Sequence, residues 1–217
     1  MYIIRTHLRL REFVSQFGTP FSESLGIDLK SKKNKEICKW FLASILYSKP
    51  IRESSATNTY RIFENDDILT PAKIMNAGWD TLVTELDEGG YTRYDFSTAT
   101  KLLEVFGNLC ERYGGDLNQL HALSKDSRDL ENRIKELGKG IGDTTVSIFL
   151  RDKRIAWSKA DPQPSPQVRL AMHELKIKDL KSFAKAKHLD LVGTETALLR
   201  LAKDFIRKGK RVDIDLS

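Results

Sequence analysis

The sequence predicts an all-α protein, and two observations support this fold class. Apolar residues recur three and four positions apart in about ten segments, which proline, glycine or capping residues separate. None of these segments alternates β-branched and polar residues between the turn residues of a hairpin. With 217 residues, the chain is long enough to bury a core as one large domain or two smaller lobes.

The boundaries of the expected helices follow from local signals. Pro50 ends the apolar segment 36–48, because proline disfavours helical geometry in the residue before it. Thr70 followed by Pro71 predicts a helix start, and Gly114 predicts a helix end. The expected helices are 3–17, 36–48, 52–65, 70–77, 78–88, 94–113, 127–137, 143–152, 168–176, 178–188 and 194–208.

The segment 94–113 has the longest periodic pattern in the chain. Phe96, Phe106, Leu109 and Tyr113 are spaced close to the helical repeat, and we expect them to share one stripe. Such a stripe is typical of a helix that buries one face. We therefore expect these side chains, Phe96 included, to face the core.

Charge and cysteine content limit the partners and cofactors. The net charge of +6 favours a polyanionic partner, either nucleic acid or an anionic membrane surface. No segment approaches the roughly 20 apolar residues of a membrane span. Cys38 and Cys110 form no C-x-x-C pair, which excludes a zinc or four-thiolate iron–sulfur site made from cysteine alone. We expect buried free thiols in a cytoplasmic protein that has no cofactor, no metal and no membrane partner.

Residues 137–150, LGKGIGDTTVSIFL, place three glycines in five positions between two helical segments. Each glycine costs a helix about 1 kcal/mol relative to alanine, so the bare backbone indicates a special use. A dinucleotide fingerprint needs a preceding strand and G-x-G-x-x-G spacing, and a Walker loop needs G-x-x-x-x-G-K with Ser or Thr. The sequence meets neither requirement. A phosphate-binding helix–hairpin–helix and a plain helical hairpin with a glycine cap remain.

In a helix–hairpin–helix, the hairpin amides and the N-terminus of the second helix point at a phosphate. Ile141 would turn back to fix the hairpin on the core, and Lys139 would add a cation beside the loop. Thr144 and Thr145 lie in the first turn, where hydroxyls cap free amides or contact a phosphate oxygen. The predicted DNA contacts of this hairpin are Gly138, Lys139, Gly140, Ile141, Gly142, Thr144 and Thr145.

Several segments together resemble one family. LGKGIGDTTVSIFLRD resembles the hairpin of the helix–hairpin–helix DNA glycosylases, the endonuclease III-like superfamily, whose pattern is Leu-Pro-Gly-(Val/Ile)-Gly-x-(Lys)-Thr-Ala. Residues 41–63 resemble the early helix–loop–helix of the family, and residues 89–117 resemble its long helix with a Tyr-Gly-Gly exit. Asp161 falls close to where the family keeps its catalytic aspartate. The resemblance covers roughly residues 36–175.

The resemblance implies the two-lobed helical fold of this family. We expect one lobe to comprise residues 36–158, with the helix–hairpin–helix at 128–151, and the other to combine 1–35 with 159–217. The resemblance also implies a monomer that binds double-stranded DNA in base-excision repair and hydrolyses the N-glycosidic bond of a damaged or mismatched base. After that base leaves the stack, the carboxylate of Asp161 would stabilise the cationic sugar.

The chain departs from the family pattern in three places. Thr144 stands where bifunctional members carry their Schiff-base lysine, so we expect a monofunctional glycosylase without lyase activity. Residues 168–217 contain no cysteine, so the C-terminal iron–sulfur cluster loop of many relatives is missing. The loop expected to wedge into the duplex lacks the usual glutamine. We expect Lys49 and Pro50 of this loop, and Arg93, to contact DNA.

Two alternatives to a glycosylase remain open. A non-catalytic relative would keep the hairpin and bind DNA without hydrolysing it, and a helical protein–protein scaffold would be basic by accident. The basic segments 30–36 and 207–211 either contact phosphates or are solvated. The aromatic side chains of Tyr47, Tyr94 and Trp157 either line a base pocket or belong to the core and the ordinary surface.

Overall fold

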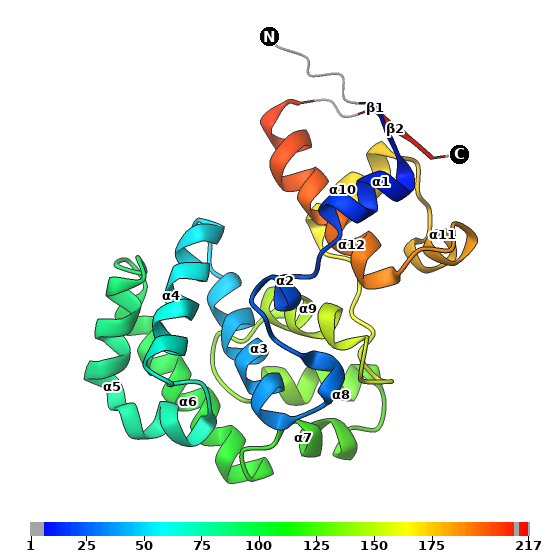
Figure 1. Ribbon diagram of the computed structural model, residues 1–217. Coiled ribbons are helices and arrows are strands. Elements are labelled where there is room, and N and C mark those ends of the chain that lie inside the picture. Colours follow the sequence, from blue (N-terminus) through cyan, green and yellow to red (C-terminus); the bar gives the residue numbers. More distant parts are fainter. Residues whose placement is uncertain (1–6, 211–212, 217) are drawn as a thin grey trace. The chain divides into compact units, whose positions relative to one another are not determined.

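The chain is almost entirely helical in the computed structural model, which describes residues 7–210 and 213–216 (Figure 1). The all-α prediction is therefore confirmed. The chain divides into two compact units, and the larger one runs without interruption from Leu25 to Pro162. The smaller unit combines the chain before Leu25 with the chain after Pro162. Residues 25–35 and 159–162, which the sequence assigned to the second lobe, belong to the larger unit instead.

A deeply buried helix, α3 (Asn34–Tyr47), is the centre of the larger unit. The ring centroid of Phe41 lies 5.9 Å from that of Phe106 and 5.0 Å from that of Phe149. The indole of Trp40 donates a hydrogen bond to the carbonyl oxygen of Phe149 at 3.1 Å. The other elements of this unit are η1 (Leu29–Ser31), α4 (Glu53–Asn65), α5 (Pro71–Glu88), α6 (Asp95–Tyr113), α7 (Leu117–Leu123), α8 (Ser127–Lys135) and α9 (Asp143–Lys153). The aromatic contacts thus attach α3 to α6 and α9.

A kink divides α5, which packs along α6 (Figure 1). Gly78 has φ 74° and ψ 174°, a conformation that interrupts the helix and that glycine adopts without a steric penalty. The hydroxyl of Thr70 accepts a hydrogen bond from the backbone N–H of Lys73, which confirms the predicted helix start. The two expected helices, up to Ala77 and after Gly78, are both present.

The stripe predicted for α6 is correct except at Phe96. Phe106, Leu109 and Tyr113 are buried, and Gly114 ends the helix with φ 60° as expected. Phe96, however, is 59% exposed, so its predicted burial is wrong. At 100° per residue, Phe96 lies about 80° around the helix from Phe106, which places it outside the buried stripe.

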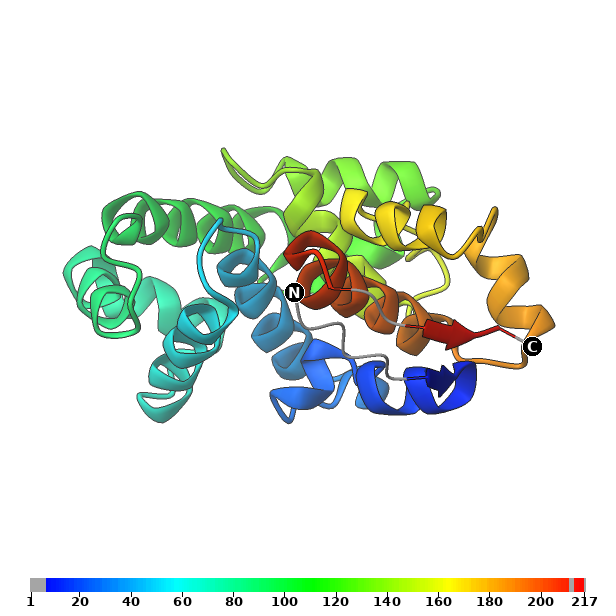
Figure 2. The same cartoon turned by 90° about the horizontal axis from the view of Figure 1, so that it is seen from above.

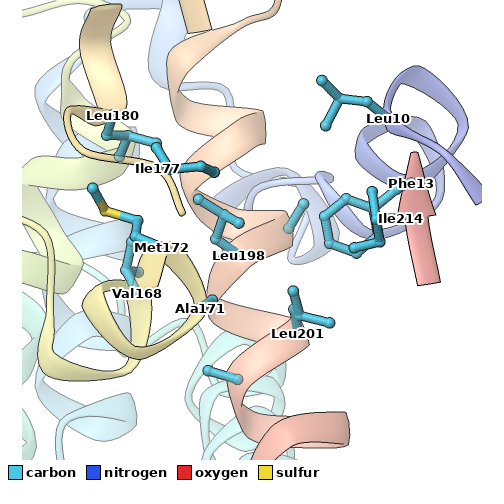
Figure 3. Close-up of a cluster of buried hydrophobic side chains, with 12 residues drawn as sticks. Leu10, Phe13, Val168, Ala171, Met172, Ile177, Leu180, Leu198, Leu201 and Ile214 are labelled. Atoms are coloured by element: carbon cyan, nitrogen blue, oxygen red, sulfur yellow. The ribbon is translucent and has the colours of Figure 1, made fainter. Parts of the chain in front are cut away.

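The smaller unit has its own apolar core, in which α1 (Leu10–Phe17), α10 (Pro166–Glu174) and α12 (Leu191–Arg200) pack together (Figure 3). Side chains from all three helices and from the C-terminal strand meet in this core, as Phe13, Ala171, Leu198 and Ile214 show. The remaining helical elements are α2 (Phe21–Ser24), α11 (Leu180–Ala186), the π-helical turn η2 (Leu201–Phe205) and η3 (Ile206–Lys208). The helix expected at 194–208 therefore begins earlier and changes its hydrogen-bonding pattern after Arg200.

Two short strands join the ends of the described chain. β1 (His7–Arg9) pairs in parallel with β2 (Asp213–Asp215), and the two lie side by side in Figure 2. The expectation of helix at residues 7–9 is therefore wrong, and residues 3–6 lie outside the described residues. Parallel partners at opposite ends of a chain carry no local turn signal, so hairpin-based reasoning does not detect them.

The structure bears on two further expectations, the absence of a membrane-spanning helix and the burial of the two cysteines. No helix in the described ranges is long and apolar enough to cross a membrane. Both cysteines are free thiols; Cys38 is buried, as predicted, and Cys110 is only half-buried. Burial raises the pKa of the Cys38 thiol to about 12.

Candidate nucleic-acid interface

Two of the three glycines between α8 and α9 meet a geometric demand, and the third does not. A Cβ on Gly138 would lie 2.6 Å from Cγ2 of Val105, so this position packs directly against α6. Gly140 has φ 83°, the left-handed conformation that side chains rarely adopt. Gly142 has an ordinary φ of −106°, and a Cβ there would meet no described atom within 4 Å. A plain glycine cap needs only one such residue, whereas this turn requires glycine at two positions, Gly138 and Gly140.

Side chains of α6 hold the hairpin through hydrogen bonds to its backbone. The ammonium of Lys101 donates to the carbonyl oxygen of Gly140 at 2.9 Å, and the amide of Asn108 donates to that of Leu137 at 2.8 Å. Ile141 is buried, as predicted for a residue that holds the hairpin on the core. These contacts hold the turn in one conformation before any ligand arrives, which lowers the entropy cost of binding.

The sequence analysis missed these α6 residues, although a signal for them exists. Polar side chains recur at helical spacing on α6, on a face other than the buried one, and each contacts the hairpin segment. These residues are Lys101, Glu104, Asn108 and Arg112. A polar stripe beside an apolar stripe indicates that a helix supports a second element there.

The N-terminus of α9 is open. Its first residues are exposed through Thr144, and its N-cap, Gly142, has no side chain to bond the first-turn amides. The partial positive charge of a helix N-terminus favours an anion at such a position. Thr145, a predicted DNA contact, is buried, so its hydroxyl does not face the surface. Thr144 therefore carries the exposed hydroxyl of this turn.

Two carboxylates lie beside the hairpin and are already engaged. Glu104 accepts the backbone N–H of Lys139 at 2.9 Å. Asp143 forms an ion pair with Lys135 across the hairpin, with 2.6 Å between Oδ1 and Nζ. Both carboxylates add negative charge and so reduce the positive potential of the turn. The ion pair with Asp143 also leaves little net charge on Lys135 for a third partner.

The predicted DNA contacts outside the hairpin are Lys49, which lies against Tyr94, and the exposed residues Pro50 and Arg93. The ammonium of Lys49 lies 5.3 Å from the ring centroid of Tyr94. Burial and the neighbouring ammonium of Lys49 together lower the pKa of Lys101 to about 8. Lys49 therefore influences Lys101, the lysine whose ammonium binds the carbonyl oxygen of Gly140. Pro50 and Arg93 are exposed, and Arg93 directly precedes Tyr94.

Asp161 lies on the segment that follows α9. Its carboxylate is partly exposed, and its Oδ1 lies 3.9 Å from Nε of Arg154. Burial, together with the charges of Asp143 and Asp161, raises the pKa of Glu131 on α8, although Lys135 acts in the opposite direction.

Trp157 belongs to the core rather than to an open pocket. It is buried, and its ring stacks on that of His121 with 4.7 Å between centroids. The ammonium of Lys153 lies 4.5 Å from the same ring and has no hydrogen-bond partner among the described residues. Burial lowers the pKa of this lysine to about 7. Of the three aromatic candidates, Tyr47 and Tyr94 are partly exposed.

Comparison with protein-family models, curated proteins and solved structures gave no match. Within the described residues, no group of three or more His, Cys, Asp or Glu side chains is placed to hold a metal ion.

Proposed function

We propose that this protein binds double-stranded DNA by holding a backbone phosphate at the hairpin between α8 and α9. The observation that carries the proposal is the open N-terminus of α9, where Gly142 and Thr144 are exposed and the left-handed Gly140 turns the chain just before the helix. Backbone amides at such a position, supported by the helix dipole, bind phosphate without a dedicated side chain. The net charge of +6 supports a polyanionic partner.

The proposed activity is that of a monofunctional DNA glycosylase with the endonuclease III-like fold. It rests on the resemblance of residues 36–175 and on Asp161. Hydrolysis of the N-glycosidic bond passes through a cationic sugar, which a carboxylate near C1′ stabilises while it orients or deprotonates water. Thr144 has no amine to attack the sugar, so the proposal includes no strand cleavage. We further infer that the protein acts as a monomer in the cytoplasm, where the free thiols stay reduced.

One observation favours a second candidate, a non-catalytic DNA-binding relative. The guanidinium of Arg154 lies 3.9 Å from the carboxylate of Asp161. A positive group at this distance offsets the field with which the carboxylate would stabilise a cationic sugar. In this second candidate, the hairpin binds DNA and Asp161 serves only to order the segment after α9.

A panel of lesions separates the two candidates. Duplexes that contain uracil, 8-oxoguanine, an alkylated base or a mismatch are incubated with the protein, and alkali then reveals abasic sites. A glycosylase yields alkali-sensitive sites on at least one duplex, and the Asp161→Asn variant loses them while the Asp80→Asn control on exposed α5 retains them. Cleavage by both variants alike removes Asp161 from the mechanism, and no cleavage on any duplex leaves the non-catalytic candidate. Borohydride should trap no covalent adduct.

A further inference from the structure

Exposed apolar side chains gather on one side of α6. Five large apolar residues are exposed among the described ones, and three of these lie on α6 or against it. They are Met75, Trp79 and Phe96, which are 38%, 39% and 59% exposed. Single exposed apolar residues are ordinary, but a contiguous group indicates an interaction surface. We call these three side chains the aromatic platform.

The two rings of the platform are held in place without a ligand. The indole N–H of Trp79 donates to the hydroxyl of Thr100 at 3.0 Å. The rings of Trp79 and Phe96 lie 5.3 Å apart between centroids, with 34° between their planes. The kink at Gly78 comes directly before Trp79, so the second segment of α5 begins with the tryptophan against α6. A fixed, amphipathic ring loses little conformational entropy when a partner stacks on it.

The stripe of α6 beneath the platform continues beyond the rings. A Cβ on Gly107 would lie 3.5 Å from Cε of Met75, so Met75 lies over this glycine. Phe96, Thr100 and Gly107 are four and seven residues apart, a spacing that keeps them on one face of the helix. At 1.5 Å per residue, the stripe from Phe96 to Gly107 is about 17 Å long.

Two basic side chains lie close in sequence or space to the N-terminal turns of α6, which carry part of the platform. Thr100, which holds the indole, is followed directly by Lys101, whose ammonium binds the carbonyl oxygen of Gly140. Lys49 lies over Tyr94, two residues before Phe96. Aromatic side chains and ammonium groups therefore both occur at the first two turns of α6, with Lys101 about 100° around the helix from Thr100. Asp95 also lies there, and its carboxylate accepts the backbone N–H of Phe96.

We propose that the aromatic platform stacks unpaired nucleobases, and that the protein recognises DNA in which a single-stranded segment adjoins a duplex. This inference rests on the proposed function, because it assigns the single strand to the side of α6 next to the phosphate-binding hairpin. Every base offers a π-face, so stacking on Trp79 and Phe96 tolerates any sequence, while Lys49 and Lys101 attract the phosphates. A platform of three side chains is too small for a stable protein interface, which buries about 800 Å² per partner.

Intrinsic fluorescence reports directly on this site. Of the three tryptophans, Trp40 and Trp157 are buried and Trp79 is exposed. Oligothymidylate added to the full chain should therefore quench tryptophan emission by stacking on Trp79. The same titration with blunt duplex should leave most of the emission unchanged, and a duplex with a thymidine overhang should restore the quenching.

Three variants test the assignment. Phe96→Ala removes one ring, Trp79→Phe keeps an aromatic side chain but removes the reporter, and Leu123→Ala is the control, because Leu123 is 57% exposed on α7. A lost stacking contact of about 1–3 kcal/mol corresponds to a loss of affinity of about five-fold or more. We expect Phe96→Ala to lose this affinity for oligothymidylate and for the overhang but not for blunt duplex, while Leu123→Ala binds like the parent.

The outcomes distinguish this inference from the proposed function. Equal binding of oligothymidylate by Phe96→Ala and the parent, with duplex binding intact, overturns the platform and leaves the hairpin proposal standing. Loss of vesicle binding or of self-association in Phe96→Ala, with single-strand affinity unchanged, overturns it in favour of another partner. If the parent binds neither blunt nor overhanging DNA, both proposals fail. Thermal unfolding of each variant confirms that the fold is retained.

Discussion

The backbone N–H of Lys139 donates to the carboxylate of Glu104 at 2.9 Å, so an acidic side chain of α6 occupies an amide of the glycine hairpin. This contact has two consequences. It fixes the turn together with the bond between Lys101 and Gly140, and it places a negative charge beside the proposed phosphate site. A phosphate therefore has to bind the amides further along, at the start of α9. The negative charge of Glu104 therefore disfavours a bound phosphate, while its hydrogen bond to Lys139 keeps the turn in the conformation that binds one.

The first prediction separates these two effects of Glu104. Glu104→Gln keeps an oxygen acceptor for the amide of Lys139 and removes the charge. We expect duplex affinity to rise about three-fold at low salt, because a unit charge some 6 Å from a phosphate contributes about 0.7 kcal/mol in water. Glu104→Ala should gain less, since it also loosens the turn. Fluorescence anisotropy with labelled duplex measures both, with Glu88→Gln as the control for net charge. An affinity that falls in Glu104→Gln would contradict a phosphate site at this turn.

The second prediction concerns the different demands on the glycines. Gly138→Ala would push a Cβ to 2.6 Å from Val105, and such overpacking costs about 1–3 kcal/mol of the free energy of unfolding. Gly142→Ser has open space and an ordinary φ, and serine is a better N-cap than glycine. Urea unfolding should therefore show a less stable Gly138→Ala variant and an unchanged or more stable Gly142→Ser variant. Equal destabilisation by both would show that the hairpin is packed differently.

The third prediction concerns the buried amine of Lys153. Its pKa of about 7 in the folded protein lies below that of an unfolded lysine, near 10.4, so the unfolded chain binds more protons between these values. The free energy of unfolding should therefore rise with pH from about 7 to about 10, by up to about 1.4 kcal/mol per unit from this group. Lys153→Met keeps the apolar stem and should be more stable than the parent at pH 6, with the difference shrinking toward pH 10. A constant difference across this range would exclude a neutral amine in the fold.

The fourth prediction has the opposite sign and concerns Glu85. Burial, followed by the hydrogen bond and charge of Asp66, raises the pKa of Glu85 to about 7. The folded protein then binds the proton more tightly than the unfolded chain, so stability should fall as pH rises from about 4 to 7. Glu85→Gln should match the parent near pH 4 and be more stable at pH 8. Denaturant midpoints at both pH values test this, and a variant that is weaker at pH 8 would show that the ionised carboxylate is needed.

The parts of the fold that depend on neighbouring residues were predictable from sequence. The cap at Thr70, the end of α6 at Gly114 and the burial of Ile141 each follow from a local pattern of residue types. The separate helices on either side of Gly78 follow in the same way. Local backbone preference is enough for the cap and the helix end, because each is decided within one turn of chain, whereas the burial of Ile141 follows from the motif pattern.

Features that join distant segments were not predictable in this way. Lys101 reaches Gly140 across 39 residues, and β1 pairs with β2 from opposite ends of the chain. The strand pairing leaves no periodic signal at one place, and the polar stripe of α6 that includes Lys101 indicates a supported element without identifying the hairpin as that element. The predicted burial of Phe96 was wrong for a different reason. Its spacing from Phe106 is close to the helical repeat, but over ten residues the deviation from whole turns amounts to about 80°. The candidate site was thus predicted at its glycines but not at the helix that supports them.

The central claim is that the amides at the start of α9 bind a DNA phosphate, and Gly142→Asp tests it most directly. The aspartate would cap these amides and add a negative charge at the same point, without steric conflict in the described structure. Gln119→Glu, at an exposed position of α7, makes the same change in net charge elsewhere. Duplex affinity is measured over a series of salt concentrations for the parent and both variants. The account predicts that the parent binds with a steep salt dependence, that Gln119→Glu binds nearly as well, and that Gly142→Asp stays folded but binds at least about ten-fold more weakly. Duplex binding by Gly142→Asp equal to that of Gln119→Glu would contradict it.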